Sequence, residues 1–275
     1  MSDLDKILAD AQDDRNILAV GTEGARNDGA VPSDKWTDLD VTLFTADPVA
    51  TDGMAVLRQI GAPIIVQHLE QTGLFGDDAF WRIWLTRFAG TKRVDLKIVA
   101  ADAEAAYLTG DSLNAIVWRR GIGAVQPRAT SAATHEVPVP TQIEFADVVN
   151  ELYWCAGNVV KGIGRANLLY ANEQLNQYVR PQLLQLLAWR ETMRQGGHFD
   201  AGVSGKFTWQ ALTRSERQEL AATYDQADLM ALRRSVVLLL DLTQRVLADF
   251  AHDGRLLVPD YVDAADMQLR ELLAR

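Results

Sequence analysis

The segment GTEGARNDGAVPSDKWTDLDVTLF, residues 21–44, decides the fold. It follows the short apolar run 16–20 and contains a glycine-bearing turn, a polar loop and an alternating run rich in β-forming residues. This order predicts a strand, a turn and a second strand. The second strand opens with Asp38-Leu39-Asp40, so it carries two carboxylates at its start.

Side chains two residues apart on a strand point to the same face, about 6.7 Å apart along the chain. Asp38 and Asp40 therefore project together, while Leu39 faces the other side. Two carboxylates this close are tolerated in water or around a divalent cation, and magnesium is usually held by one or two carboxylates plus substrate phosphates. Asp95, in the apolar run 94–99, completes such a group if the two strands are neighbours. The alternative is that these acids are ordinary solvated surface residues.

The glycine turn Gly24-Ala25-Arg26 follows the first predicted strand. Backbone N–H groups at such a turn bind anions such as a triphosphate, and a glycine permits close approach. Glu23 would repel a triphosphate if it faced inward, but on an alternating strand it can equally face away. Lys97 lies on the same strand face as Asp95 and either neutralises Asp95 or contacts the nucleotide.

The rest of the chain reads as two halves. Strand-like runs at 63–66, 80–88 and 93–99, the last two forming a hairpin, mix with helical periodicity at 53–60, which is typical of an α+β or α/β sheet domain. A glycine- and proline-bearing connection follows at 121–142. Helical periodicity then covers 143–161, 166–195, 214–223 and 225–250, which predicts a helical bundle. Pro181 either begins a new helix or kinks one.

Composition excludes several classes of protein. The chain has 275 residues, and 48% of them are apolar, which excludes a disordered protein. Its formal net charge of −10 argues against binding to the phosphate backbone of a nucleic acid. Its single cysteine, Cys155, excludes an intramolecular disulfide and a four-cysteine zinc site. The N-terminus lacks the features of a signal peptide, and the longest strongly apolar stretch, 236–240, is too short to span a membrane. We therefore expect a cytoplasmic protein without nucleic-acid or membrane partners.

Three motifs together resemble a known active-site pattern. Gly24-Ala25-Arg26, Asp38-Leu39-Asp40 and Arg93-Val94-Asp95-Leu96 are similar, in order and spacing, to the motifs of the polymerase-β-type nucleotidyltransferases. They resemble most closely the aminoglycoside 6-adenylyltransferases, which modify streptomycin. Tyr153-Trp154-Cys155, Val159-Val160-Lys161-Gly162 and the segment 175–181 resemble the helical signatures of that family. The resemblance runs from about residue 5 to about 250, with alanine in place of the usual serine at position 25.

This resemblance implies an α+β fold: a nucleotidyltransferase domain with a mixed β-sheet over residues 1–135, followed by an α-helical substrate-binding bundle over 136–275. It implies a substrate in the cleft between them, with ATP as co-substrate and Mg as cofactor. The adenylyl group would pass to a hydroxyl of streptomycin or a related aminoglycoside and release pyrophosphate. We expect a monomer. Two alternatives stay open: a binding protein with weakened catalysis, motivated by Ala25 and Glu23, and an adenylyltransferase with a different hydroxylated acceptor.

The resemblance also assigns roles in the first domain. Asp38 and Asp40 hold the metal ions. Asp95 contacts the attacking hydroxyl and serves as a general base, as a metal ligand or as both. Gly24, Ala25 and Arg26 bind the nucleotide phosphates.

In the second domain, Trp154, Asn158 and Lys161 share one helix face, as do Asn176 and Arg180. Lys161 either reaches a nucleotide phosphate or favours the helix C-terminus, and Trp154 either contacts substrate or belongs to the core. Asn176 and Arg180 either contact substrate or fix the bend at the following proline.

Overall fold

The structure, a computed structural model, describes residues 1–76 and 78–275, and the chain divides into two compact units, residues 1–134 and 135–275. The elements of the first unit, in chain order, are α1 (Asp3–Asp13), β1 (Ile17–Thr22), the 3-10 helix η1 (Gly24–Asn27), β2 (Leu39–Thr45), α2 (Gly53–Ile60), β3 (Ile65–Thr72), β4 (Phe80–Arg87), β5 (Arg93–Ala100), η2 (Ala101–Ala103), α3 (Glu104–Gly110) and β6 (Ala115–Arg119). The short turn η3 (Ala133–His135) lies at the boundary of the units.

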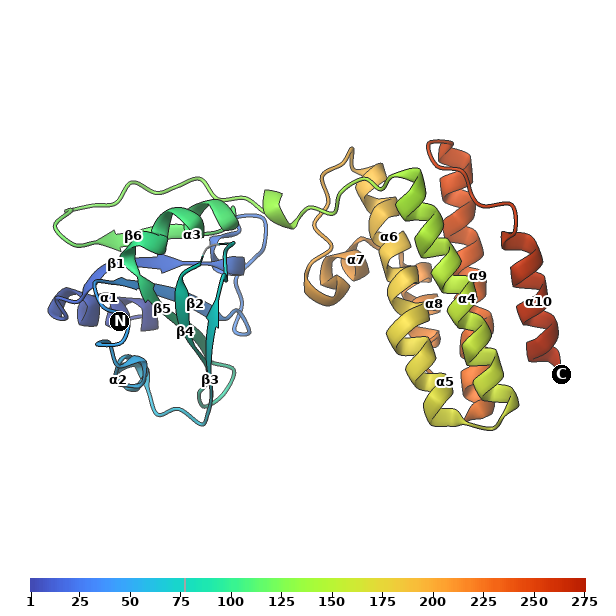
Figure 1. Ribbon diagram of the computed structural model, residues 1–275, viewed down its shortest axis with the longest axis horizontal. Coiled ribbons are helices and arrows are strands. Elements are labelled where there is room, and N and C mark those ends of the chain that lie inside the picture. Colours follow the sequence, from blue (N-terminus) through green and yellow to red (C-terminus); the bar gives the residue numbers. More distant parts are fainter. Residues whose placement is uncertain (77) are drawn as a thin grey trace. The chain divides into compact units, whose positions relative to one another are not determined.

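The strands of the first unit form one sheet in the order β3-β4-β5-β2-β1-β6. β2 and β5 pair in parallel and the other neighbours are antiparallel, so the sheet is mixed. Apolar residues of α1 and α2 cover one face, while Tyr107 of α3 packs with Phe44 on the other (Figure 1). The sequence-based prediction of an α+β fold, with a mixed sheet followed by helices, is confirmed.

The second unit is helical. Its elements are α4 (Gln142–Gly164), α5 (Leu168–Gln174), the π-helical turn η4 (Leu175–Val179), α6 (Arg180–Arg194), η5 (Val203–Gly205), α7 (Lys206–Ala211), α8 (Arg214–Ala222), α9 (Leu229–Asp253) and α10 (Val262–Ala274). α4, α6 and α9 pack against one another around a common apolar core, with α10 against α4 (Figure 1). Within the described residues, no helix is both long and apolar enough to cross a bilayer.

The segment predicted as one helix over 166–195 is divided in the structure. A π-helical turn joins α5 to α6, and Pro181 occupies the first turn of α6. A proline there lacks the N–H that would bond to the preceding turn, which accounts for the widened turn in front of it. The helices α3, α7 and α10 and the strand β6 were not predicted. α3, α7 and β6 have only five to seven residues, too few periodic positions to identify them, whereas α10 has 13 residues and was missed.

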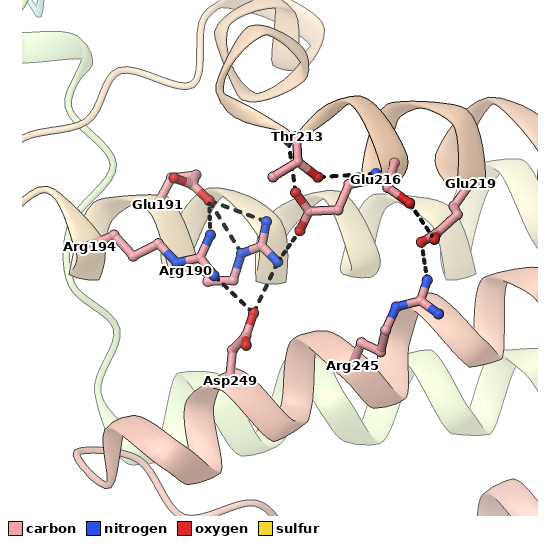
Figure 2. A network of polar contacts seen from close by, with 9 residues as sticks. Arg190, Glu191, Arg194, Thr213, Glu216, Glu219, Arg245 and Asp249 are labelled. Carbon is pink, nitrogen blue, oxygen red and sulfur yellow. Dashed lines mark hydrogen bonds and ion pairs between the residues drawn. The ribbon is translucent and has the colours of Figure 1, made fainter.

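A buried arginine holds α6 to α8 and α9 (Figure 2). The Arg190 side chain is 5% exposed, and its Nη1 lies 2.6 Å from Glu216 Oε1 of α8 and 3.1 Å from Asp249 Oδ2 of α9. Its Nε donates to Oε1 of the buried Glu191 at 3.3 Å, and its Nη2 lies 3.2 Å from the same oxygen. Arg194, which is 48% exposed, binds Glu191 and Asp249 from the solvent side. The charge of Glu191 is therefore shared by one buried and one half-exposed arginine.

Candidate active site

The structure brings the three predicted carboxylates together at the start of two neighbouring strands. In the parallel pairing of β2 with β5, Asp40 lies opposite Asp95, and Asp38 directly precedes β2. The two-residue period of a strand places all three on the sheet face that α3 covers farther along. This group, Asp38, Asp40 and Asp95, is here called the acidic edge.

Arg93 joins two members of the acidic edge. Its Nη2 lies 2.6 Å from Asp95 Oδ2 and its Nε donates to Asp95 Oδ1 at 3.0 Å, while its Nη1 lies 3.1 Å from Asp38 Oδ2. Burial raises the pKa of Asp38, and the attraction of Arg93 opposes that shift. The guanidinium group therefore stands between the two carboxylates and spans them.

Asp40 is the member of the edge without a partner. Across residues 1–76 and 78–275, its carboxylate forms no hydrogen bond or ion pair. Burial raises the pKa of Asp40 to about 6, with Lys97 acting in the opposite direction. Gly24 has φ +65°, and a Cβ on it would lie 3.2 Å from Asp40 Oδ2. The glycine turn thus packs directly on this carboxylate, in a conformation that favours glycine.

Glu23 lies on the same sheet face as Asp40, with its carboxylate directed to Thr42 and Lys97. Its carboxylate accepts a short hydrogen bond from Thr42 Oγ1, and its Oε2 lies 2.6 Å from Lys97 Nζ. Burial alone would lower the pKa of Lys97, but the neighbouring carboxylates of Glu23 and Asp40 outweigh it and raise that pKa. The sequence left open whether Glu23 faces a triphosphate or faces away; the structure shows its carboxylate paired with Lys97.

The turn itself is short. η1 spans only Gly24–Asn27, so any phosphate would bind individual N–H groups and Arg26 rather than the dipole of a long helix. The exposed Arg26 donates from Nε to the backbone carbonyl of Asp38 at 3.2 Å. Asn27 donates from Nδ2 to the carbonyls of Thr22 and Leu113, at 2.7 and 2.8 Å. The turn is thereby fastened to β1 and to the acidic edge.

The acidic edge fits a divalent cation in part. Its donors are carboxylate oxygens, the ligands that magnesium prefers, and Asp40 carries a desolvated charge without a partner. Within the described parts of the chain, however, no three or more His, Cys, Asp or Glu side chains are arranged as a metal site. The guanidinium of Arg93 contacts both Asp38 and Asp95. Magnesium needs no complete protein cage when substrate phosphates supply further ligands.

The predicted residues of the second unit lie in two groups. Trp154 is 74% exposed and is not part of the core. With Asn158 of the same helix it lines a groove of about 380 Å³ between α4 and α10. Lys161, at the end of α4, donates to Asn158 Oδ1 at 3.0 Å and lies over the Tyr170 ring.

Asn176 and Arg180 are joined to each other on the turn before α6. Arg180 Nε donates to Asn176 Oδ1 at 3.2 Å. Arg180 is buried, its Nη1 and Nη2 donate to Oγ1 and O of Thr223, and its guanidinium lies 3.7 Å from the Tyr224 ring centroid. The exposed Asn176 also bonds to Gln226 at 2.8 Å. Arg180 therefore holds the connection between α8 and α9, while the amide of Asn176 stays at the surface.

Sequence reasoning gave Arg93 and Asn27 no role. The signal for Arg93 was its position two residues before Asp95, which places both on one strand face. Asn27 carried no comparable signal, because its partners Thr22 and Leu113 are brought to it by the pairing of β1 with β6.

The sequence of this chain is similar to those of known proteins. The family model described as streptomycin adenylyltransferase matches residues 2–264. An aminoglycoside 6-adenylyltransferase of Campylobacter jejuni is 29% identical over 222 residues, which cover 80% of this chain and 77% of the relative. One of Bacillus subtilis (strain 168) is 29% identical over 224 residues, covering 80% and 79%.

The fold is also found among solved structures. The crystal structure of an aminoglycoside 6-adenyltransferase from Bacillus subtilis aligns over 100% of both chains, with a TM-score of 0.51 and 22% sequence identity. At this level of identity the likeness concerns the fold alone.

Proposed function

Because the chain belongs to the streptomycin adenylyltransferase family and is thus a nucleotidyltransferase, we propose that it transfers the adenylyl group of ATP to a hydroxyl of streptomycin or a related aminoglycoside. Magnesium is the proposed cofactor and pyrophosphate the second product. The observation that carries this proposal is the register of β2 and β5, which sets Asp40 beside Asp95 and next to the glycine turn.

The proposed roles follow from the positions of the side chains. Asp38 and Asp40 hold magnesium, which when bound offsets the charge of the triphosphate and of the carboxylates. The N–H groups of Gly24 and Ala25 and the guanidinium of Arg26 support the phosphate tail. The acceptor oxygen attacks the α-phosphorus, the bond from that phosphorus to the bridging oxygen breaks, and pyrophosphate leaves.

Asp95 is the acid that we propose to receive the proton of the attacking hydroxyl. Its carboxylate is buried and is held in a fixed orientation by two contacts to Arg93, which supports a positioned base. A role as an additional metal ligand is compatible with the same position, since Asp40 lies opposite it.

In the helical unit, the exposed Trp154 and Asn176 are the proposed contacts for the aminoglycoside, and Lys161 for a phosphate of the nucleotide. An exposed indole and an exposed amide suit a polyhydroxylated cation, through cation–π contact and hydrogen bonding. Arg180 is retained as a substrate-binding candidate through its contact with Asn176.

The direct test combines the protein with ATP, magnesium and streptomycin and measures pyrophosphate. We expect release that requires all three, together with an adenylylated drug detected by mass spectrometry. No release across a panel of aminoglycosides would refute the proposed substrate class. Release with other hydroxylated molecules alone would favour a different acceptor.

The alternative of a binding protein without transfer rested on Glu23 and Ala25. The ion pair of Glu23 with Lys97 argues against the first reason, because it reduces the repulsion that Glu23 would exert on a triphosphate. Calorimetry with ATP and magnesium distinguishes the two: a nucleotide that binds but is not consumed with any acceptor supports the alternative.

Ala25 leads to a further prediction, that Ala25→Ser tightens nucleotide binding. A hydrogen bond to a charged group contributes about 1.5–3 kcal/mol, so we expect the KM for ATP to fall about tenfold or more with little change in kcat. Steady-state kinetics with varied ATP measures it. Ala30→Ser, in the exposed loop after the turn, is the control and should leave KM unchanged. An unaltered KM in Ala25→Ser would mean that position 25 does not face the phosphates.

A further inference from the structure

We propose that Arg93 is a positioning residue that bridges Asp38 and Asp95 and competes with a divalent cation for both carboxylates. The inference rests on the proposed function, because it concerns the metal that adenylyl transfer would use at the acidic edge. It assigns to Arg93 two effects of opposite sign, one on metal binding and one on the reaction.

The geometry gives the first part of the argument. Arg93 approaches Asp95 through two nitrogens, Nε at 3.0 Å and Nη2 at 2.6 Å, and uses its remaining terminal nitrogen for Asp38 at 3.1 Å. All three donor positions of the planar guanidinium are therefore committed to the acidic edge. Such bidentate contacts fix the orientation of a carboxylate as well as its position.

The second part is the distribution of charge. The Nζ of Lys97 lies 2.6 Å from Glu23 Oε2, so Lys97 does not bridge Asp38 and Asp95. Asp40 has no partner among the described residues, so Arg93 is the cation in direct contact with the acidic edge there. Two carboxylates that share one cation are the groups a divalent ion would take over, and a cation at that place repels the incoming ion.

The consequence for metal binding is a gain when Arg93 is neutralised. Arg93→Gln removes a positive charge within contact distance of the ligands, so we expect Mn²⁺ to bind at least about tenfold more tightly in the absence of nucleotide. The consequence for the reaction is a loss, because Asp95 is no longer held in one orientation, and we expect a lower kcat. A residue with only a structural role would weaken both.

The experiment measures Mn²⁺ binding to the full chain by electron paramagnetic resonance, without nucleotide, in the unchanged protein and in Arg93→Gln. Arg58→Gln is the matched control. Arg58 lies on α2, which packs on the sheet face opposite the acidic edge, is exposed and forms no ion pair with the described residues, so its replacement alters the net charge equally. We expect its effect on Mn²⁺ affinity to stay below about threefold, because exposed charges are screened.

Arg93→Lys separates charge from geometry. It keeps the positive charge but not the planar fork, so Mn²⁺ affinity should stay near that of the unchanged protein while kcat falls. The shift in melting temperature on adding Mn²⁺ is a second measurement, and it should be larger in Arg93→Gln than in the unchanged protein. In Arg93→Gln, the bound Mn²⁺ supplies the positive charge that the guanidinium of Arg93 no longer provides.

Equal or weaker Mn²⁺ binding by Arg93→Gln, or no binding by either protein, overturns the inference. The proposed function fails by a separate result, the absence of pyrophosphate release from the unchanged protein with any acceptor. Tighter binding in Arg93→Gln together with normal transfer by the unchanged protein supports both.

Discussion

Asp40→Asn is expected to abolish adenylyl transfer without destabilising the protein. Losing an outer partner of a metal ligand already costs roughly 10–100-fold in activity or metal affinity, so losing a proposed ligand should exceed that range. Stability should be equal or higher, because burial already disfavours the charge of this carboxylate and raises its pKa to about 6. Pyrophosphate release and thermal unfolding without metal measure the two effects.

Activity and melting temperature together distinguish a catalytic role of Asp40 from a structural one. Asp13→Asn, the same chemical change at an exposed carboxylate at the end of α1, should alter neither activity nor melting temperature. Transfer that survives in Asp40→Asn would contradict every catalytic role assigned to the acidic edge. A marked fall in melting temperature would instead show that the carboxylate stabilises the sheet.

Arg190→Met is expected to cause the largest loss of stability. Removing one partner of a buried ion pair leaves an uncompensated charge and costs about 3–5 kcal/mol. Here Glu216, 17% exposed, loses the arginine that lies 2.6 Å from it, and Glu191, 7% exposed, keeps only Arg194 (Figure 2). Unfolding in urea, followed by circular dichroism, measures the change in the free energy of unfolding.

Two further variants test this cause. Arg194→Met removes the 48% exposed arginine that binds the same two acids, and an exposed pair contributes at most about 1 kcal/mol. In the double variant Arg190→Met with Glu191→Met part of the stability should return, because apolar groups can replace a buried pair, while Glu216 stays without its arginine. If Arg190→Met costs no more than Arg194→Met, the buried arginine is not the main contact of this network.

The sequence was sufficient for what depends on local pattern. Alternation and a two-residue period placed Asp38 and Asp40 on one strand face, and helical periodicity identified the long helices. The position of Asp95 beside Asp40 was a conditional prediction, because it requires β2 and β5 to pair, and strand pairing is not a local property. The resemblance to a family supplied the reason to expect that pairing.

Other features were beyond local pattern for the same physical reason. That Arg93 spans Asp38 and Asp95, and that Glu23 turns toward Lys97, both depend on which strands become neighbours in the sheet. The exposure of Trp154 was also not evident, since a tryptophan at helical spacing is more often part of a core. The exposure of Trp154 depends on which elements pack around α4, and these elements come from distant parts of the chain.

The central position of β2 and β5 in the sheet has a consequence for the motions of the protein. Both strands have a paired neighbour on each side, so their amide hydrogens should exchange with solvent more slowly than those of the edge strands β3 and β6. The acidic edge is therefore carried by the part of the first unit that opens least often. If the acidic edge carries the reacting groups, as proposed, their spacing does not depend on the substrate, and adaptation to different acceptors falls to side chains elsewhere.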